Sequence, residues 1–494
     1  MSTLYNWIFD QDLDMKQTII STQNIDYTYL DFLNEIEEYS ALLEPLHLKN
    51  KKIALIVGSV PSFLGLTLAV SKLGGISIPI SPQLRNEDLL GVLDFTDPHI
   101  VFTSQRNNGF PLSESVHEWA MESQRESVIF DSDNDVNWNM SVYEGVKRDL
   151  EFTNIQVIGC TSGSTGTPKG IVADLEFFKV NDERYRVVSN VSLEDRIFLM
   201  APASGLFGMC WLLSSMHSQY PIVTTESFSF PDIIQLLEQK PTNKLVSTPS
   251  LFRALHIFSK SLRSLCLERL SLVSLAGEAI TEDFLVAMSD VKSKINSFYG
   301  FSELGSMMFT QNDVREGLKW SLLPNVQHKL AIEVNDQEIG EILFKAGHPF
   351  LGYYRRKDLS DEVYVNGWYH SGDLAKVNQN GEIEIIGRKK NMIKKGGQQV
   401  IPEEIEQCLG QHEGVEKAVI VGIPHSVYGE QIIAFVVKGK DVVKPEIYNY
   451  LENRIARYKI PDQIHFIEEI PITNSKIDKV LLRQMAMKRN ETSY

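Results

Sequence analysis

The sequence predicts an α/β protein with a large N-terminal part and a smaller α+β C-terminal part. Apolar runs alternate with segments of helical period in two stretches, a β-rich stretch follows them, and a segment rich in Lys, Arg and Gly precedes the final region. The length of 494 residues leaves room for two to four structural units. Hydrophobic residues make up 43% and charged residues 23%, which is typical of soluble folded chains and excludes disordered, collagen-like and disulfide-scaffold proteins.

The first α/β unit is predicted from residue 53 onward. Its apolar runs IALIVGS, ISIPIS and HIVFTS are separated by the helical segments PSFLGLTLAVSKLGG and NEDLLGVLDF. The alternation returns after residue 150 and predicts a second unit, through VIGC, RIFLMAP, PIVTT, PDIIQLLEQK, KLVST, LSLVSLAG and KINSFYG. Such alternation is typical of βαβ units that build mostly parallel, doubly wound sheets.

Residues 326–387 show a different sequence pattern, with short β-like runs separated by Gly or Asn-Gly turns. This pattern predicts a small antiparallel or barrel-like subdomain. After the basic segment GRKKNMIKKGGQQV come a predicted helix, two strands and another helix: PEEIEQCLGQH, AVIVGI, IIAFVVKG and KPEIYNYLENRIARY. We therefore expect a boundary near residues 388–391, which divides the chain into residues 1–387 and 388–494.

The net charge of −16 argues against a nucleic-acid partner or an anionic membrane surface. Four widely spaced cysteines form no CxxC pair and predict neither a zinc site nor a disulfide framework, which fits the cytoplasm. The N-terminus has no secretory pattern. Residues 53–70 carry no formal charge, but Pro61 interrupts them, so we interpret them as strand, turn and helix and expect no transmembrane segment.

Residues 160–170, CTSGSTGTPKG, form the clearest candidate for a functional loop. Three glycines, five hydroxyl side chains and one lysine can present backbone N–H groups, hydroxyls and a cation to a polyphosphate. The spacing is not that of a Walker A loop. By composition alone, a solvated Ser/Gly turn remains an equal alternative.

TSGSTGTPKG resembles the phosphate loop of the adenylate-forming superfamily: acyl-CoA synthetases, adenylation domains of peptide synthetases, and luciferases. Further segments match in the order of that family: GEA at 277–279, FYGFSE at 298–303, GEI with GYY within 340–354, GWYHSGDL at 367–374, GRKKNMIKKGGQQVIPEEIE at 387–406, GIPHSVYGE at 422–430, and YKIP with PITNSKID within 458–478. Together they span about 320 residues. The chain is identified as a member of this superfamily, most similar to an acyl-CoA synthetase.

The resemblance implies a two-step reaction. A carboxylic acid joins the α-phosphate of ATP with release of pyrophosphate, and the acyl group then passes to a thiol. The implied cofactors are ATP, Mg²⁺ and CoA, or the phosphopantetheine of an acyl carrier protein in place of CoA. The implied fold has two α/β subdomains and a distorted β-barrel in the large part. It also has a mobile C-terminal part that turns about a hinge, with the active site at the interface.

The resemblance also assigns residues to ATP. Those expected around the β- and γ-phosphates are Thr161, Ser162, Gly163, Ser164, Thr165, Gly166 and Lys169. The other residues expected to bind the nucleotide are Gly277, Glu278, Ala279, Tyr299, Gly300, Phe301, Asp373 and Arg388. Of these, Tyr299 and Phe301 offer an aromatic face for the adenine, Asp373 is expected at the ribose, and Arg388 at the ribose or a phosphate. Taken singly, Tyr299 and Phe301 fit a core equally well, and the Gly-Asp of Asp373 fits a common turn.

The catalytic residues implied by the resemblance are Ser302, Glu303 and Lys476. Ser302 would contact the α-phosphate, Glu303 would help to hold Mg²⁺, and Lys476 would bridge the attacking carboxylate and the α-phosphate. Alone, Glu303 could be a solvated carboxylate. Lys476 follows Ser475 where the family usually has Gly, and its loop is one residue shorter than usual, so Lys479 is the alternative.

The hinge is expected at Lys390. The lysines around it are either solvated charge or, for some of them, contacts to pantetheine or a nucleotide phosphate: Lys389, Lys394 and Lys395. The acid pocket is expected at Ala203, Gly205, Phe207 and Gly300. Many acyl-CoA synthetases have PLFH where this chain has Pro-Ala-Ser-Gly, so Gly205 stands at the position of the gating His. Members that activate amino acids usually place an Asp near Ala203, whose absence favours an acid without an α-amino group.

The sequence leaves the acceptor open between CoA and a carrier protein or amine, with CoA favoured because no carrier domain follows. A non-catalytic nucleotide- or acyl-binding protein is the alternative of another class. We expect a cytoplasmic enzyme that is a monomer or a homodimer and that takes a small carboxylic acid.

Overall fold

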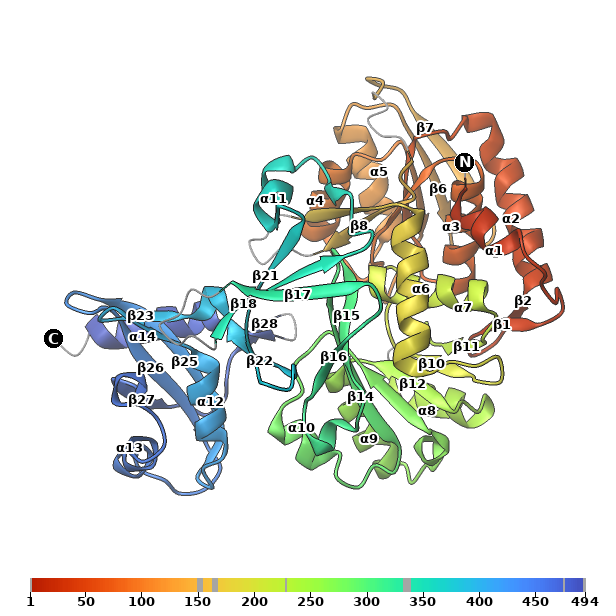
Figure 1. The fold of residues 1–494 in the computed structure, drawn as a ribbon. Coiled ribbons are helices and arrows are strands. Elements are labelled where there is room, and N and C mark those ends of the chain that lie inside the picture. The colour runs from red at the N-terminus through yellow and green to blue at the C-terminus, as the bar shows by residue number, and fades with distance from the viewer. Residues whose placement is uncertain are drawn as a thin grey trace. The chain divides into compact units, whose positions relative to one another are not determined.

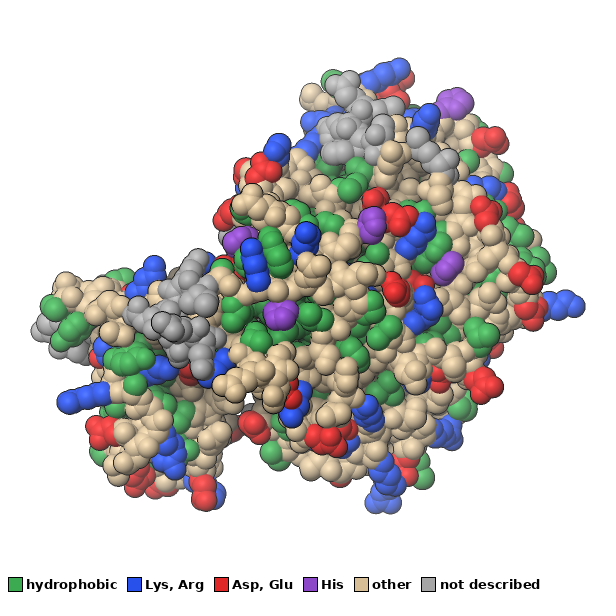
Figure 2. All heavy atoms as spheres, viewed as in Figure 1, with side chains coloured by type: hydrophobic (Ala, Val, Ile, Leu, Met, Phe, Trp, Pro, Cys, Tyr) green, Lys and Arg blue, Asp and Glu red, His purple; other side chains and the backbone are tan. Residues whose placement is uncertain are grey.

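The computed structural model describes residues 2–148, 154–161, 168–226, 229–331, 339–473 and 476–491 (Figure 1). The chain forms two compact units. The first comprises Met1–Val326 and Ala346–Glu362, and the second comprises Gln327–Lys345 and Val363–Tyr494. Residues 388–391 lie inside the second unit, and the functional boundary expected there stays a prediction. Side chains of both charge signs are interspersed over the face shown in Figure 2.

The first sheet of unit 1 has the strand order β19-β9-β8-β4-β3-β5-β6-β7. Strands β3, β4, β5, β6 and β8 pair in parallel, whereas β7, β9 and β19 are antiparallel additions. The strands are β3 (Lys52–Ile56), β4 (Ile76–Pro79), β5 (Ile100–Ser104), β6 (Ser127–Ser132), β7 (Asn139–Tyr143), β8 (Val157–Thr161), β9 (Lys169–Ala173) and β19 (Gly352–Tyr353). The helices between them are α3 (Val60–Lys72), α4 (Asn86–Thr96) and α5 (Leu112–Glu122).

The uncharged segment at residues 53–70 forms strand β3, a turn and helix α3, as the sequence predicts. Ser59 is the N-cap of α3, and Pro61 lies in its first turn, where the missing N–H costs no hydrogen bond. The helix is apolar on every side because it is buried on nearly every side. Among the described residues, no helix is long and apolar enough to cross a membrane.

The second sheet of unit 1 has the order β16-β15-β14-β13-β12-β10-β11-β1-β2. The strands from β14 to β1 in this order are parallel neighbours, and β2, β15 and β16 are antiparallel additions. The strands are β1 (Thr18–Ser21), β2 (Asp26–Thr28), β10 (Ile197–Leu199), β11 (Ile222–Thr224), β12 (Lys244–Ser247), β13 (Leu272–Leu275), β14 (Lys294–Phe301), β15 (Gly305–Thr310) and β16 (Trp320–Leu322). The helices are α1 (Leu4–Phe9), α2 (Tyr29–Leu43), α6 (Leu175–Ser189), α7 (Leu206–Ser218), α8 (Phe230–Gln239), α9 (Pro249–Ser261) and α10 (Glu282–Ala287).

Unit 2 begins with strands in the order β17-β18-β21-β22. Strands β18, β20 and β22 each pair antiparallel with β21. These strands are β17 (Val326–Ala331), β18 (Ile339–Ala346), β20 (Tyr364–Val365), β21 (Trp368–Val377) and β22 (Ile383–Arg388). The short helix α11 (Lys357–Val363) belongs to unit 1 except for its last residue. The β-rich texture predicted for residues 326–387 is therefore observed.

The rest of unit 2 is a sheet of order β24-β23-β26-β25, with β27 beside β26 and helices on both faces. Successive residues of β25 face opposite sides, so Ile420 packs in the core of α12 and α13 while Val419 and Val421 pack with Leu482 of α14. The elements are β23 (Ile393–Lys395), β24 (Gln398–Val400), α12 (Pro402–Gly410), β25 (Val415–His425), β26 (Gly429–Lys438), α13 (Lys444–Glu452), β27 (Gln463–Phe466), β28 (Ile472–Thr473), β29 (Lys476–Ile477) and α14 (Lys479–Glu491). The α/β fold class with an α+β end is confirmed.

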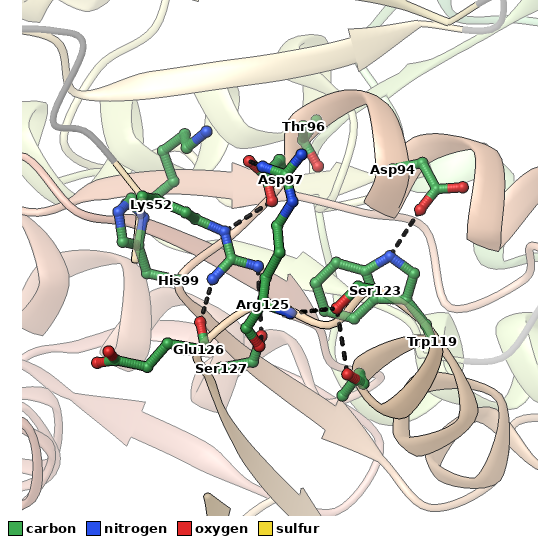
Figure 3. Close-up of polar contacts among 12 residues, drawn as sticks. Lys52, Asp94, Thr96, Asp97, His99, Trp119, Ser123, Arg125, Glu126 and Ser127 are labelled. Atoms are coloured by element: carbon green, nitrogen blue, oxygen red, sulfur yellow. Dashed lines mark hydrogen bonds and ion pairs between the residues drawn. The ribbon is translucent and has the colours of Figure 1, made fainter. Parts of the chain in front are cut away.

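A polar network holds the end of α4 to the first sheet (Figure 3). The chain leaves α4 through Asp97 in a left-handed conformation, with φ of 48°. The Asp97 carboxylate accepts a hydrogen bond from Arg148 Nε at 2.6 Å and also pairs with Arg125. Trp119 Nε1 donates to Asp94 at 2.9 Å. Because Asp97 is buried, these guanidinium groups compensate its charge.

His99 lies two residues after Asp97, and its buried position predicts that the stability of the fold depends on pH. Its Nδ1 accepts the backbone N–H of Lys52 at 3.1 Å, and burial, with the positive charges of Lys52 and Arg148, lowers its pKa from 6.5 to about 4. The folded state thus resists protonation, so unfolding takes up a proton between these two pH values. We expect the free energy of unfolding to be at its full value above pH 6.5 and to fall as the pH drops toward 4.

Denaturant unfolding at pH 7 and pH 5 measures this effect. His99→Asn offers an oxygen in place of Nδ1 and cannot become charged, so it should reduce the stability difference between the two pH values. The matched control is His348→Asn at an exposed position, which should keep the difference. An unchanged pH dependence in His99→Asn would contradict the role of this ring.

Candidate functional site

Strands β8 and β9 form an antiparallel pair whose connection is the predicted phosphate loop. The backbones of Thr161 and Lys169 are cross-strand neighbours, so the two ends of the loop are held together by the sheet. The Lys169 Nζ lies over the ring of Tyr353, 5.4 Å from its centroid. The other loop residues of the prediction lie outside the described residues: Ser162, Gly163, Ser164, Thr165 and Gly166.

Ser302 and Glu303 lie on the tight turn between β14 and β15. Ser302 is exposed, and Glu303 is half-buried. The Tyr353 hydroxyl donates to Glu303 Oε1 at 2.5 Å, and the backbone N–H of Phe350 donates to the Glu303 carbonyl oxygen at 2.9 Å. The side chain and the backbone of Glu303 are therefore both oriented.

Tyr353 thus links two predicted site residues. Its ring lies under the Lys169 cation and its hydroxyl holds the Glu303 carboxylate. Its place is fixed because β19 pairs with β9 and sets Tyr353 opposite Ile171. The GYY segment resembled the family, but the sequence assigned no role to Tyr353, because the contact joins residues 50 positions apart.

Helix α6 also supports the turn between β14 and β15 that carries Ser302 and Glu303. The Nη1 of Arg184 donates to the Leu304 carbonyl oxygen at 2.9 Å, and the Asn181 Oδ1 accepts the backbone N–H of Ser306 at 3.3 Å. A side chain at Gly305 would collide with Asn181, since its Cβ would lie 1.9 Å from Oδ1. Asn181 and Arg184 could not be predicted as site residues from the sequence, because their pattern on α6 is that of ordinary helix residues.

The chemistry of Glu303 fits a magnesium ion that is bound together with a nucleotide. Among the described residues, no group of three or more His, Cys, Asp or Glu side chains could hold a metal ion. Mg²⁺ in nucleotide sites characteristically takes one or two carboxylates and completes its shell with phosphate oxygens and water. Glu303, half-buried and oriented by Tyr353, offers such a single carboxylate.

Several residues predicted to bind the nucleotide fall at the ends of the neighbouring parallel strands β13 and β14. Gly277 follows β13 with φ of 86°. Glu278 accepts the backbone N–H of Ser250 at 3.1 Å and so already caps the first turn of α9. Tyr299 and Phe301 meet edge to face, with ring centroids 5.1 Å apart. Ala279 follows Glu278 in the same loop.

Gly300 must be a glycine in this fold. Its Cβ would lie 2.3 Å from the carbonyl oxygen of Gly305, because β14 and β15 approach closely there. The backbone of the FYGFSE segment can therefore come near a ligand that a larger residue would keep away.

The residues predicted for the acid pocket, Ala203, Gly205 and Phe207, lie at the start of α7. Gly205 is its N-cap, and a Cβ there would meet only the carbonyl oxygen of Pro202, at 3.5 Å. Figure 1 shows α7 beside α6, which it contacts. Phe207 belongs to an aromatic cluster that we define by four residues: Tyr185, Phe207, Trp211 and Phe298.

In unit 2, Asp373 and Arg388 are cross-strand neighbours on β21 and β22. The Arg388 Nε lies 2.6 Å from Asp373 Oδ1, and the Asp373 side chain is 3% exposed. Behind them, the Glu341 carboxylate accepts the backbone N–H of Gly372 at 3.0 Å and contacts Lys389 Nζ at 2.9 Å. Burial raises the Glu341 pKa, but the Lys389 and Gly372 hydrogen bonds outweigh it and leave that pKa below its ordinary value.

Lys390 lies in a short 3-10 helix, Lys389–Asn391. Lys476 begins β29, which pairs with β28 and sets Lys476 opposite Thr473, while its side chain lies outside the described part. The alternative lysine, Lys479, is held elsewhere in unit 2: its Nζ lies 3.1 Å from Glu406 Oε1 and 3.7 Å from Glu403 Oε1.

The chain is similar in sequence to known CoA ligases. The 2-succinylbenzoate–CoA ligase of Oceanobacillus iheyensis is 26% identical over 469 residues, covering 92% of this chain and 93% of the ligase. The long-chain-fatty-acid–CoA ligase of Salmonella typhimurium is 28% identical over 357 residues, covering 69% of this chain and 63% of that enzyme.

Solved structures show the same fold. ATP-bound MatB from Rhodopseudomonas palustris superposes with a TM-score of 0.82 at 19% identity, covering 98% of each chain. The Bacillus subtilis o-succinylbenzoate CoA synthetase MenE, in complex with its acyl-adenylate intermediate, gives a TM-score of 0.80 at 19% identity, covering 97% of this chain and 98% of MenE.

Two family models match consecutive parts of the chain. The AMP-binding enzyme C-terminal domain matches residues 404–476. The AMP-binding enzyme model matches residues 12–354, which is well over half of the chain. The superfamily predicted from the sequence motifs is therefore confirmed, and this chain belongs to the AMP-binding enzyme family.

Proposed function

We propose that the chain is an AMP-forming acid–thiol ligase, which activates a carboxylic acid as an acyl-adenylate and transfers the acyl group to CoA. The observation that carries the proposal is the turn at Ser302 and Glu303, which presents an exposed hydroxyl and an oriented carboxylate. Tyr353 connects this turn to the phosphate-loop lysine, because its hydroxyl donates to Glu303 and its ring lies against Lys169. Its relatives named as CoA ligases support the thiol acceptor.

In the first half-reaction, the formation of the acyl-adenylate, each residue of the site has its own role. Lys169 and the phosphate loop bind the β- and γ-phosphates, and Ser302 donates to the α-phosphate. A bound Mg²⁺ supplies positive charge that neutralises the phosphates, and Glu303 is the carboxylate that holds it. Positioning and charge neutralisation are the main contributions that such a reaction needs.

In unit 2, Asp373 accepts hydrogen bonds from the ribose hydroxyls, and Arg388 contacts the ribose or a phosphate. Each of the two must exchange part of the present ion pair for contacts with the nucleotide. The proposal places the enzyme in the cytoplasm, where the free thiol of CoA stays reduced.

The test is ATP–pyrophosphate exchange over a panel of aliphatic, aryl and amino acids, followed by detection of the CoA thioester. Exchange with a carboxylic acid that lacks an α-amino group, together with thioester formation, supports the whole proposal. Exchange without thioester would reject CoA as the acceptor and favour a carrier protein or an amine. ATP binding without exchange for any acid would reject the ligase.

Lys390→Pro tests the expected hinge. Proline fixes φ near −65° and restricts the preceding residue, so it limits the rotations that a hinge needs. We expect near-normal pyrophosphate exchange but a thioester rate lowered about tenfold or more, because the two half-reactions use different positions of the C-terminal part. The matched control is Lys390→Ala, which removes the same side chain but leaves the backbone rotations free and should keep both half-reactions near normal. Equal loss of both half-reactions in Lys390→Pro would contradict the hinge.

A further inference from the structure

Lys52 is a buried cation that holds the end of a tyrosine side chain. It is the first residue of β3 and is 3% exposed. Its Nζ donates to the Tyr354 hydroxyl at 2.7 Å, and this hydroxyl donates in turn to the Thr96 carbonyl oxygen at 3.3 Å. Because an ammonium group can only donate, the two bonds use both roles of the hydroxyl and fix its direction. Figure 3 includes Lys52 and Thr96 with the network around Asp97.

Tyr354 contacts the residue that follows the phosphate-loop lysine. Its backbone N–H donates to the Gly170 carbonyl oxygen at 2.7 Å. The two residues pack closely, since a Cβ at Gly170 would lie 2.8 Å from the Cβ of Tyr354. Lys169, which the proposed function assigns to the β- and γ-phosphates, directly precedes Gly170. The place of Tyr354 therefore limits the movement of the backbone that carries Lys169.

Tyr354 also follows Tyr353, whose hydroxyl donates to Glu303 and whose ring lies against Lys169. Strand β19 holds Tyr353 opposite Ile171 but has only two residues, so its pairing with β9 supplies few hydrogen bonds. The side chain of Tyr354 adds a second attachment, because it is buried in the core of the first sheet and bonded to Lys52.

We propose that Lys52 is a positioning residue for MgATP: through its hydrogen bond to Tyr354 it holds the segment that orients Lys169 and Glu303. The inference rests on the proposed function, to which it adds a residue that lies outside the ATP contacts. Without this bond, the Tyr354 hydroxyl loses a charged donor and the two tyrosines are held less firmly. The groups assigned to the β- and γ-phosphates and to Mg²⁺ are then less well placed, whereas those assigned to the adenine keep their places.

Equilibrium binding of MgATP and of AMP to the full chain, without any acid, tests this role. Lys52→Met and Tyr354→Phe should each raise the Kd of MgATP about tenfold, which is part of what a hydrogen bond from a charged group contributes. The Kd of AMP should change little, because AMP lacks the β- and γ-phosphates. The double variant should resemble the single variants, because all three lose the same hydrogen bond.

Tyr29→Phe is the matched control. Tyr29 is a fully buried tyrosine of the same unit, and its hydroxyl donates to the Met216 carbonyl oxygen at 2.6 Å. Its loss should lower the free energy of unfolding, as Tyr354→Phe does, but leave the binding of both nucleotides unchanged. Denaturant unfolding of each variant measures the change in stability. Tyr354→Phe keeps its ring in the core, so it provides the test if Lys52→Met does not fold.

Two outcomes overturn the inference alone. Unchanged MgATP binding in Tyr354→Phe and in folded Lys52→Met would leave Lys52 with a purely structural role. Equal weakening of MgATP and AMP binding would show a general loss of the nucleotide site and would do the same. Wild type that binds neither nucleotide would instead reject the proposed function, and the inference with it. Wild type that binds MgATP but exchanges with no acid would reject the ligase, while the binding of the variants would still decide the role of Lys52.

Discussion

Lys476→Ala should lower the rate of acyl-adenylate formation by roughly 10² to 10³ while the protein stays folded. The expected role of Lys476 is to place a cation between the attacking carboxylate and the α-phosphate, where negative charge concentrates as they approach. Loss of one oriented group that stabilises such charge costs a factor of this size. Single-turnover pyrophosphate release with saturating acid and ATP measures it directly.

Lys479→Ala is the control. Lys479 lies within reach of Glu403 and Glu406, and burial raises the Glu406 pKa although Lys479 opposes the shift. Its removal should lower the free energy of unfolding and leave adenylation nearly unchanged. If adenylation were near normal in Lys476→Ala but lost in Lys479→Ala, Lys479 and not Lys476 would be the catalytic lysine. The shortened loop at Ser475 would then explain why the catalytic lysine stands at the later position.

The parallel strands of unit 1 that the apolar runs predicted could be found because they depend on local patterns. The sequence did not predict the other strands of this unit, which are β1, β2, β6, β7, β9, β15, β16 and β19. Residues 53–59 read as a buried strand and end in the N-cap of α3 at Ser59, and each later apolar run also becomes a strand. The phosphate loop could be found in the same way, since its chemistry lies in eleven consecutive residues.

The supports of the site could not be predicted, because they depend on contacts between distant segments. Tyr353 meets Glu303 only because β19 adds to β9, and Arg184 reaches Leu304 across 120 positions. An arginine in α6 fits the exposed face of an amphipathic helix, and only the packing of α6 shows that Arg184 is buried. Glu278 shows the reverse case, in which a residue expected at the nucleotide already has a structural role as a helix cap.

Glu303→Gln should lower pyrophosphate exchange by about 100-fold and weaken its response to Mg²⁺. The amide keeps the length of the side chain and an oxygen for the Tyr353 hydroxyl, so the orientation of the turn is retained. What it loses is the charge, which a hard divalent cation requires in its carboxylate ligand. Titration of exchange against Mg²⁺ at fixed ATP should show a higher half-saturating concentration in Glu303→Gln than in wild type.

Tyr353→Phe separates charge from orientation. It keeps the Glu303 carboxylate and the ring beneath Lys169 but removes the hydroxyl that donates to Oε1. A hydrogen bond to a charged group contributes about 1.5–3 kcal/mol, so exchange should fall by roughly tenfold to 100-fold, with a smaller change in the Mg²⁺ response than in Glu303→Gln. An unaltered Mg²⁺ titration in Glu303→Gln would contradict the metal role. If the Mg²⁺ titration were unaltered in Glu303→Gln and Tyr353→Phe still lost most of its pyrophosphate exchange, Glu303 would act by holding the Ser302 turn against Tyr353.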